Sequence, residues 1–313
     1  MEKKSFSIIG TTKTKSTIEK TAQYIFTICG LCAVFAVLAI TVYMLISGMP
    51  AIFDVGLKEL IFSTEWKPTA QNPNYGILYI ILTSIVGTGL AVLIGVPIGV
   101  GTAIFLAEIA PVRLAKIVKP AVELLAGIPS VIYGLLGILI LNPVMYKLEK
   151  IIFANSSTHQ FTGGANLISA VLVLAIMILP TVVNISESAI RSVPANYKSS
   201  SLALGATKIQ TIFRVILPSA KSGIMTAIVL GVGRAIGEAM AISLVAGNSV
   251  NMPLPFNSVR FLTTALVSEM SYAAVGSTHR NVLFTIGLVL FAFIMLINIT
   301  LTKIMKNGGK KDE

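Results

Sequence analysis

Six long stretches of hydrophobic residues alternate with shorter polar segments along the chain. An apolar stretch of about 20 residues is long enough for a helix to cross the hydrocarbon core of a bilayer. Gly127 and Pro129 interrupt the third stretch, and Gly95 and Pro97 in the second favour a kink or a tilt. The pattern predicts an all-α integral membrane protein with spans at roughly 24–47, 76–106, 121–142, 166–187, 222–246 and 282–304.

The composition supports this interpretation. The chain is 55% hydrophobic and only 12% charged, with a mean hydropathy of +0.86. Soluble domains carry roughly 25% charged residues, so a soluble globular protein is a poor match.

Lysine and arginine are distributed unevenly between the two ends of the predicted spans. Most of them lie in residues 1–20, 108–119, 188–221 and 303–313, which share one side if the spans alternate in direction. Loops rich in these residues stay in the cytoplasm, so we expect both termini to be cytoplasmic in a multi-pass protein of the bacterial plasma membrane. The net charge of +11 then reflects topology and not nucleic-acid binding, because no basic stretch is interleaved with aromatic residues.

The spans form one membrane domain, which we place at residues 21–306 between a basic cytoplasmic tail (1–20) and a short cytoplasmic tail (307–313). We detect no internal repeat, so a complete two-fold pore would need a second copy or a related subunit. The outer segments are too short to be domains. The stiff apolar strip Met252–Phe256 in the last of them could contact an outer partner or cap its own helices, and we favour the cap.

The loop at about 192–218 has the pattern of a docking element. Thr207 and Gln210 fit a capping box, and Gly205 can close the preceding helix in the left-handed conformation. Pro218 is expected to stop the second helix. An i, i+3, i+4 spacing predicts one apolar face made of Ile209, Ile212, Phe213, Ile216 and Leu217. The alternative is an interfacial helix that only lies on the lipid headgroups.

Arg234 and Glu238 are the charged residues inside the predicted fifth span. A span that begins near Ser222 would place Arg234 about 18 Å along it, close to mid-membrane. A charge at that depth costs at least ~2.5 kcal/mol on insertion scales, so it should face a water-filled path or a partner. The i, i+4 spacing would put both side chains on one helix face, where they could bond each other.

Two functions are open for this pair. One is a structural lock between helices. The other is a cationic site on an anion path, with Arg234 holding an oxyanion and Glu238 weakening that hold so that the anion is released. Gly233 and Gly237 form a small-xxx-small pattern and are expected to allow close helix packing beside the pair.

No catalytic or metal site is expected. Cys29 and Cys32 lie in the first span, where we expect buried, unpaired thiols. His159 and His279 fall in outer loops and are expected to be solvated, without a neighbouring carboxylate cluster.

Two further features have ordinary explanations. Glu123 is expected to reach water or to pair with Lys119 four residues earlier. The glycine cluster 231–237 has the wrong spacing for a dinucleotide fingerprint, and no Walker-type loop occurs in the sequence. Energy for transport would therefore come from another subunit or from a gradient.

The loop resembles the motif of permeases of ABC importers, in which a triplet precedes x-x-x-Gly and Leu-Pro follows about a dozen residues later. Ser199, Ser200 and Ser201 occupy the triplet, followed by Gly205, Ala206 and Thr207, with Leu217 and Pro218 at the end. The resemblance implies a coupling helix that inserts into a groove of a cytoplasmic ATPase. The usual glutamate of the motif is Ser199 here, so a salt bridge made by that glutamate is not expected.

Several separated motifs resemble the PstC-type permease of high-affinity phosphate importers more specifically. They are Trp66-Lys-Pro, Tyr75-Gly-Ile-Leu, Ala126–Gly134, Gly233–Ala241 and Asn281–Phe291. The resemblance implies the permease fold of type I (MetI-like) ABC importers, with Arg234 and Glu238 on the phosphate path.

The same resemblance implies a set of partners. They are a PstA-like permease, a dimer of PstB-like ATPases that binds the ATP and Mg²⁺, and a PstS-like phosphate-binding protein. This chain would be a non-catalytic subunit without a cofactor of its own. The alternatives are a permease for another oxyanion (sulfate, molybdate or phosphonate) and an ATP-independent anion channel or carrier.

Overall fold

The computed structural model describes residues 13–309 and the side chains of residues 19–303. It is almost wholly helical, and six helical stretches in the described part are long and apolar enough to span a membrane, which confirms the predicted number. The spans run Glu19–Phe62, Leu78–Ile109, Ser130–Ile152, Leu167–Arg191, Lys208–Gly237 and Thr278–Lys303. The chain is therefore a multi-pass membrane protein. The predicted tails lie largely outside the described residues, although α1 already begins at Lys13.

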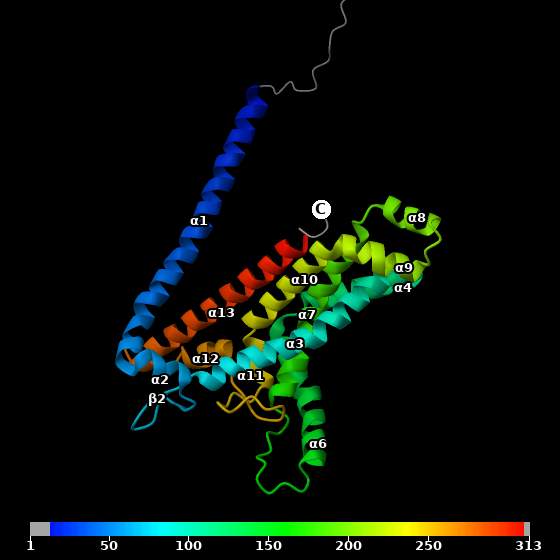
Figure 1. Ribbon diagram of the computed structural model, residues 1–313. Helices are drawn as coiled ribbons and strands as arrows, with labels where there is room; N and C mark the ends of the chain where they lie inside the picture. The colour runs from blue at the N-terminus through cyan, green and yellow to red at the C-terminus, as the bar shows by residue number, and fades with distance from the viewer. Residues whose placement is uncertain (1–12, 310–313) are drawn as a thin grey trace, which may run out of the picture.

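The helices follow one another in a simple order (Figure 1). They are α1 (Lys13–Ala51), α2 (Leu57–Phe62), α3 (Leu78–Ile104), α4 (Val112–Gly127), α5 (Ser130–Leu136), α6 (Asn142–Ile152), α7 (Leu167–Arg191), α8 (Ala195–Ala203), α9 (Lys208–Thr211), α10 (Leu217–Gly237), α11 (Met240–Val245), α12 (Leu262–Glu269) and α13 (Thr278–Gly309). Four π-helical turns continue them without a break: η1 (Ile52–Gly56), η2 (Phe105–Ile109), η3 (Gly137–Leu141) and η4 (Ile212–Ile216). A short antiparallel pair, β1 (Trp66–Lys67) and β2 (Asn74–Tyr75), pairs Trp66 with Tyr75.

Helix α7 forms the centre of the core and packs between α3 and α10. The close approach depends on glycines of its neighbours. A Cβ atom on Gly95 of α3 would lie 2.7 Å from Ile178 of α7, and one on Gly99 would lie 2.8 Å from Val182. A Cβ atom on Gly231 of α10 would lie 2.9 Å from the same Val182. The glycines of α3 therefore serve packing, and α3 runs on as one helix through Pro97.

Gly233 and Gly237 pack against no other helix within the described chain, so their close packing stays a prediction for an interface with a second subunit. A Cβ atom on either glycine would meet no atom within 4 Å. The reason is that α7 contacts the face of α10 that carries Gly231, whereas Gly233 lies on a different face. The surface at Gly233 and Gly237 is left open by this subunit.

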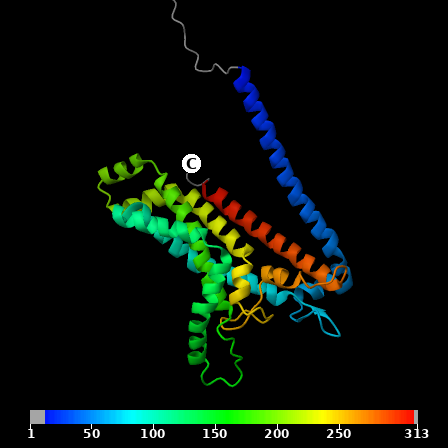
Figure 2. The ribbon, with the colours of Figure 1, turned by 180° about the vertical axis from the view of Figure 1, so that it is seen from behind.

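Helix α1 leans away from the other helices over most of its length (Figures 1 and 2). It is held to α13 near its C-terminal end, where Thr285 donates a hydrogen bond to the Gly48 carbonyl at 2.9 Å. Cys29 and Cys32 lie on the separated part and are exposed, so their predicted burial is wrong. The sequence pattern identifies an apolar helix, but what covers that helix is decided by neighbouring elements.

The third and fifth spans differ from their predicted bounds. The chain breaks at Ile128–Pro129, so α4 is separate and the third span begins only at Ser130. The fifth span starts at Lys208 and ends at Gly237, where residues as far as 246 were expected to continue the helix. Pro218 does not stop a helix, because it occupies the first turn of α10 and the π-helical turn before it rearranges the hydrogen bonds that a proline cannot make.

The strip Met252–Phe256 caps its own fold, as expected. Pro255 and Asn257 offer their carbonyl groups to the backbone N–H groups of Ile168 and Leu167 at the start of α7, at 3.1 and 3.0 Å. These bonds satisfy N–H groups that have no partner within the helix. The outer segment 247–261 is thereby fixed to the N-terminal end of α7.

Candidate functional site

Arg234 lies in the last turn of α10 and is half-buried. Its Nη1 donates to the hydroxyl Oγ1 of Thr181 on α7 at 3.4 Å. In the described part of the chain no carboxylate forms an ion pair with it, so most of its hydrogen-bonding capacity is unused. A guanidinium in this state can take up an oxyanion through two parallel N–H bonds.

Glu238 does not share a helix face with Arg234, and the expected i, i+4 bond between them is absent among the described residues. The helix ends at Gly237, and Glu238 has extended backbone (φ −74°, ψ 127°). Its Oε1 accepts the backbone N–H of Ala241 at 2.9 Å, at the start of α11. Its carbonyl oxygen accepts the hydroxyl of Thr263 on α12 at 2.7 Å.

The span is therefore broken beside its charged residue. Glu238 is used to join α10, α11 and α12, and this leaves the positive charge of Arg234 without an ion-pair partner in the described chain. A helix break at membrane depth is tolerated only where protein or a water-filled cavity surrounds it. The geometry is suited to an anion path.

The loop 192–218 folds as two short helices joined at Gly205, as predicted. Gly205 has φ +86°, and its N–H donates to Leu202 O at 3.0 Å, while Ala206 N–H donates to Ser201 O at 3.3 Å. These two bonds form a Schellman cap at the end of α8. The capping box is present as well, with Thr207 N–H donating to Gln210 at 2.9 Å.

Two contacts hold this loop in shape. The hydroxyls of Ser201 on α8 and Thr211 on α9 lie 2.9 Å apart, which joins the two helices across the glycine. Lys198 forms an ion pair with Glu108 at the end of the second span, at 2.5 Å. Ser199 is exposed. Its hydroxyl Oγ lies 3.2 Å from the Ala195 carbonyl oxygen and 3.1 Å from the Asn196 carbonyl oxygen, so it donates within its own helix. Ser200 is also exposed.

The expected single apolar face of this loop is divided in two. Ile212 and Ile216 are buried against the membrane domain, with Leu217 half-buried beside them, whereas Ile209 and Phe213 are 68% and 61% exposed. The π-helical turn changes the angle between successive residues, so a 3.6-residue period no longer describes the segment. Leu204 is exposed as well. The exposed side chains of Leu204, Ile209 and Phe213 form the apolar surface of this loop.

A buried carboxylate stabilises the end of the bundle from which the 192–218 loop extends. Glu187 on α7 is 1% exposed and bonds Arg191 Nε at 2.7 Å and Lys119 Nζ of α4 at 3.1 Å. Arg191 also donates to the Leu106 carbonyl at 2.9 Å. Of the two alternatives expected for Glu123, the structure supports contact with water, because Lys119 turns toward the buried carboxylate and Glu123 is exposed.

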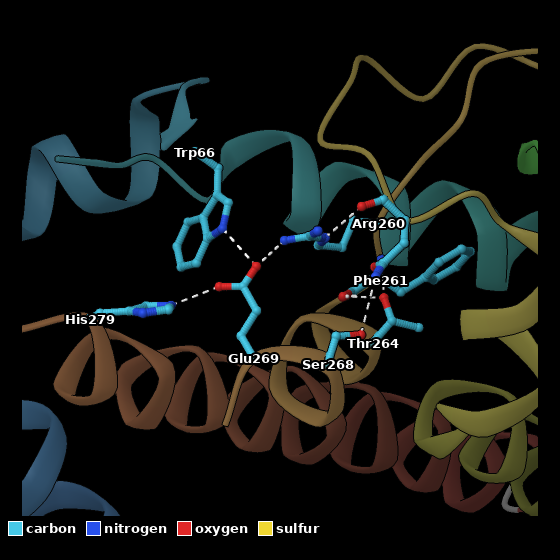
Figure 3. A network of polar contacts seen from close by, with 8 residues as sticks. Trp66, Arg260, Phe261, Thr264, Ser268, Glu269 and His279 are labelled. Atoms are coloured by element: carbon cyan, nitrogen blue, oxygen red, sulfur yellow. Dashed lines mark hydrogen bonds and ion pairs between the residues drawn. The ribbon is translucent and has the colours of Figure 1, made fainter. Parts of the chain in front are cut away.

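The opposite end of the bundle contains a second buried network (Figure 3). Glu269, at the end of α12, is 3% exposed and accepts from Trp66 Nε1 at 3.0 Å, from Arg260, and from His279 Nε2 at 2.7 Å. The network joins β1, α12 and α13. Burial raises the pKa of the neighbouring Tyr75 phenol, and burial followed by the Glu269 charge raises the pKa of Tyr272, so both stay neutral at pH 7.

Both histidines are expected from the sequence to be solvated, but both contact a glutamate, with His279 buried and His159 half-buried. His159 bonds Glu149 at 2.8 Å, in the same manner as His279 bonds Glu269. In each pair the histidine follows its glutamate by ten residues. That shared separation is a signal in the sequence, but a loop joins the partners in each pair. Ten residues across a loop match no helix or strand period, so the spacing alone does not predict the contact.

The chain was compared with known proteins. Residues 95–307 match the family model described as binding-protein-dependent transport system inner membrane component. The chain belongs to this family. It is 39% identical to the probable ABC transporter permease protein YqgH of Bacillus subtilis, with 93% of both chains covered. It is 32% identical to the phosphate transport system permease protein PstC of Haemophilus influenzae, with 88% of this chain and 93% of that protein covered.

Solved structures of ABC transporters contain chains with a similar fold. A chain of a bacterial alginate ABC transporter has a TM-score of 0.63 at 15% identity, over 92% of this chain and 96% of its own length. A chain of the MetNI methionine ABC transporter has a TM-score of 0.56 at 19% identity, over 74% and 95%. The all-α importer-permease fold expected from the sequence is confirmed.

Proposed function

We propose that this chain is the PstC-like permease subunit of an ATP-driven phosphate importer. The observation that carries the proposal is Arg234, a half-buried guanidinium without an ion-pair partner in the described chain, beside a break between two membrane helices. The names of the relatives, several of which are PstC proteins, support phosphate as the anion. In this proposal Arg234 binds the anion on the path, and Glu238 holds the break in shape.

Two exposed surfaces of this chain are available for the proposed partners. A PstA-like permease would complete the path on the open side of Gly233 and Gly237. A dimer of PstB-like ATPases would bind ATP and Mg²⁺ and would contact the exposed apolar surface of Leu204, Ile209 and Phe213. A PstS-like protein would deliver phosphate on the opposite side. The loop and both termini would then be cytoplasmic, and this subunit would have no catalytic role.

Uptake of labelled phosphate at micromolar concentration tests the proposal. Cells that lack this gene and keep the partner subunits would receive the wild type, Arg234→Gln or the control Arg113→Gln, which changes an exposed arginine of α4. Loss of a charge-assisted hydrogen-bond donor is expected to lower uptake at least roughly tenfold in Arg234→Gln. The control should transport normally.

Competition identifies the anion. Excess unlabelled phosphate should abolish uptake, and sulfate, molybdate or phosphonate should not. Strong inhibition by one of those anions would favour the second candidate, a permease for that oxyanion. Phosphate flux from the purified chain in liposomes without ATP would instead support a channel or carrier and overturn the proposal.

A further inference from the structure

One face of α7 carries polar side chains along the inner part of its membrane span. Thr181, Asn184 and Ser188 follow one another at i, i+3 and i+7, so they form a single stripe on the helix. Thr181 and Asn184 are half-buried and Ser188 is exposed. The stripe begins at the residue that contacts Arg234 and runs toward the end of α7 that carries Arg191.

These side chains have unused hydrogen-bonding groups. Thr181 accepts from Arg234, but within the described residues its own hydroxyl, the Ser188 hydroxyl and the Asn184 amide donate to nothing. The Asn184 Oδ1 is buried and has no donor there. Some other hydroxyls in the spans, those of Thr102 and Thr226 among them, donate to carbonyls of their own helices, whereas those of Thr83 and Ser186 are buried without a partner.

The exposure of this face of α7 changes at Thr181, the residue that contacts Arg234. Leu174, Met177 and Ile178, which precede it on the same face, are at most 2% exposed. After Thr181 the face opens, and Ser188 is exposed on the surface. Unpaired polar groups cost several kcal/mol in lipid, so this open face must meet water or another protein.

We propose that Thr181, Asn184 and Ser188 form the inner half of the anion path, which takes the oxyanion over from Arg234 by uncharged hydrogen bonds. The inference rests on the proposed function. Neutral donors stabilise an anion without the strong attraction of a second cation, so the anion can leave the arginine and move on.

Accessibility of single cysteines tests the path. The background is Cys29→Ser/Cys32→Ser in the full transporter, since both native thiols are exposed. Asn184→Cys and Ser188→Cys are compared with Ile176→Cys, which changes a residue that is 45% exposed but lies on the other side of α7. A membrane-impermeant, charged thiol reagent is applied to inside-out vesicles. It is expected to label the Asn184→Cys and Ser188→Cys variants at least tenfold faster than the Ile176→Cys variant, and to stop ATP-driven phosphate transport from the vesicle lumen only in the first two.

Asn184→Leu provides a second measurement. It should lower phosphate uptake about tenfold or more, while the amount of assembled transporter, measured by co-purification of the ATPase, is unchanged. Thr226→Val, which removes a hydroxyl already bonded to its own helix, should leave uptake as it is.

The outcomes separate the two claims. Absence of phosphate uptake in the cysteine-free background and in the wild type would refute the proposed function itself. Normal wild-type uptake together with unlabelled positions 184 and 188, or with full uptake by an assembled Asn184→Leu transporter, would overturn only the path along α7.

Discussion

Glu238 accepts the backbone N–H of Ala241 at 2.9 Å, so the carboxylate that follows the end of α10 fixes the start of α11. This bond replaces the ion pair with Arg234 that a continuous helix would have made. The negative charge remains near the site, but its oxygen is used for the fold. Arg234 is thereby positioned by α7 and left available for an anion.

Glu238→Ala is expected to loosen the junction of α10 and α11. Loss of a side-chain cap costs about 1 kcal/mol, and here the freed N–H lies beside the path. We expect phosphate uptake to fall severalfold while the subunit still assembles. Glu123→Ala, which removes an exposed carboxylate of α4, is the control. Equal uptake by the two variants would show that the cap is dispensable.

Thr263→Val should have a related effect from the opposite side of the junction. The Thr263 hydroxyl donates to the Glu238 carbonyl at 2.7 Å in a buried site, so its loss leaves a carbonyl unpaired at a cost of about 1–3 kcal/mol. Uptake should decrease in Thr263→Val and recover in Thr263→Ser, which keeps the donor. Failure of the serine variant to recover would contradict this role of the hydroxyl.

Gly205→Ala is expected to weaken coupling to the ATPase. The glycine has φ +86° with free space around it, so the penalty comes from the backbone alone and amounts to roughly 1–2 kcal/mol. Asparagine tolerates the left-handed conformation better, so Gly205→Asn should retain more activity. The measurement is ATP hydrolysis by the reconstituted transporter. An alanine variant as active as the asparagine variant would mean that the elbow conformation is not required.

Glu187→Ala should destabilise the inner end of the bundle. It removes the bonds to Lys119 and Arg191, and a hydrogen bond between charged groups contributes about 1.5–3 kcal/mol. Because both cations are nearly half exposed, water can take over their solvation and we expect the lower end of that range. The midpoint of thermal unfolding in detergent should fall, and Glu123→Ala should leave it unchanged.

Glu269→Gln should disrupt the outer network, and the chain contains its own probe. Trp66 is the single tryptophan of the sequence and donates to Glu269, so its fluorescence emission should shift when the carboxylate is lost. Arg260 is then left with its charge buried, which costs about 3–5 kcal/mol. Glu149→Gln, which affects His159 and not Trp66, should lower stability without a shift in emission.

Much of the fold could be predicted from local pattern. Hydropathy identified six spans because backbone groups in a bilayer must be satisfied within helices. Thr207, Gln210 and Gly205 act through neighbours within a few residues, so the capping box and the glycine elbow were visible in the sequence. Arg234 was also recognised from its position alone, since a charge within an apolar span is costly.

Contacts between distant segments decided the rest. The end of α10 depends on Thr263 of α12, and Lys119 turns to Glu187 from another helix. His159 and His279 meet glutamates ten residues earlier in the sequence, but it is the fold of the loop between them that brings each pair together. Hydropathy and spacing carry no information on such partners. The sequence by itself therefore determined a six-span membrane protein with a two-helix loop joined at a glycine and a charged residue in a span. Only the tertiary structure decided that Glu238 leaves the helix, because its carbonyl accepts from Thr263 of α12, which lies 25 residues further along the chain.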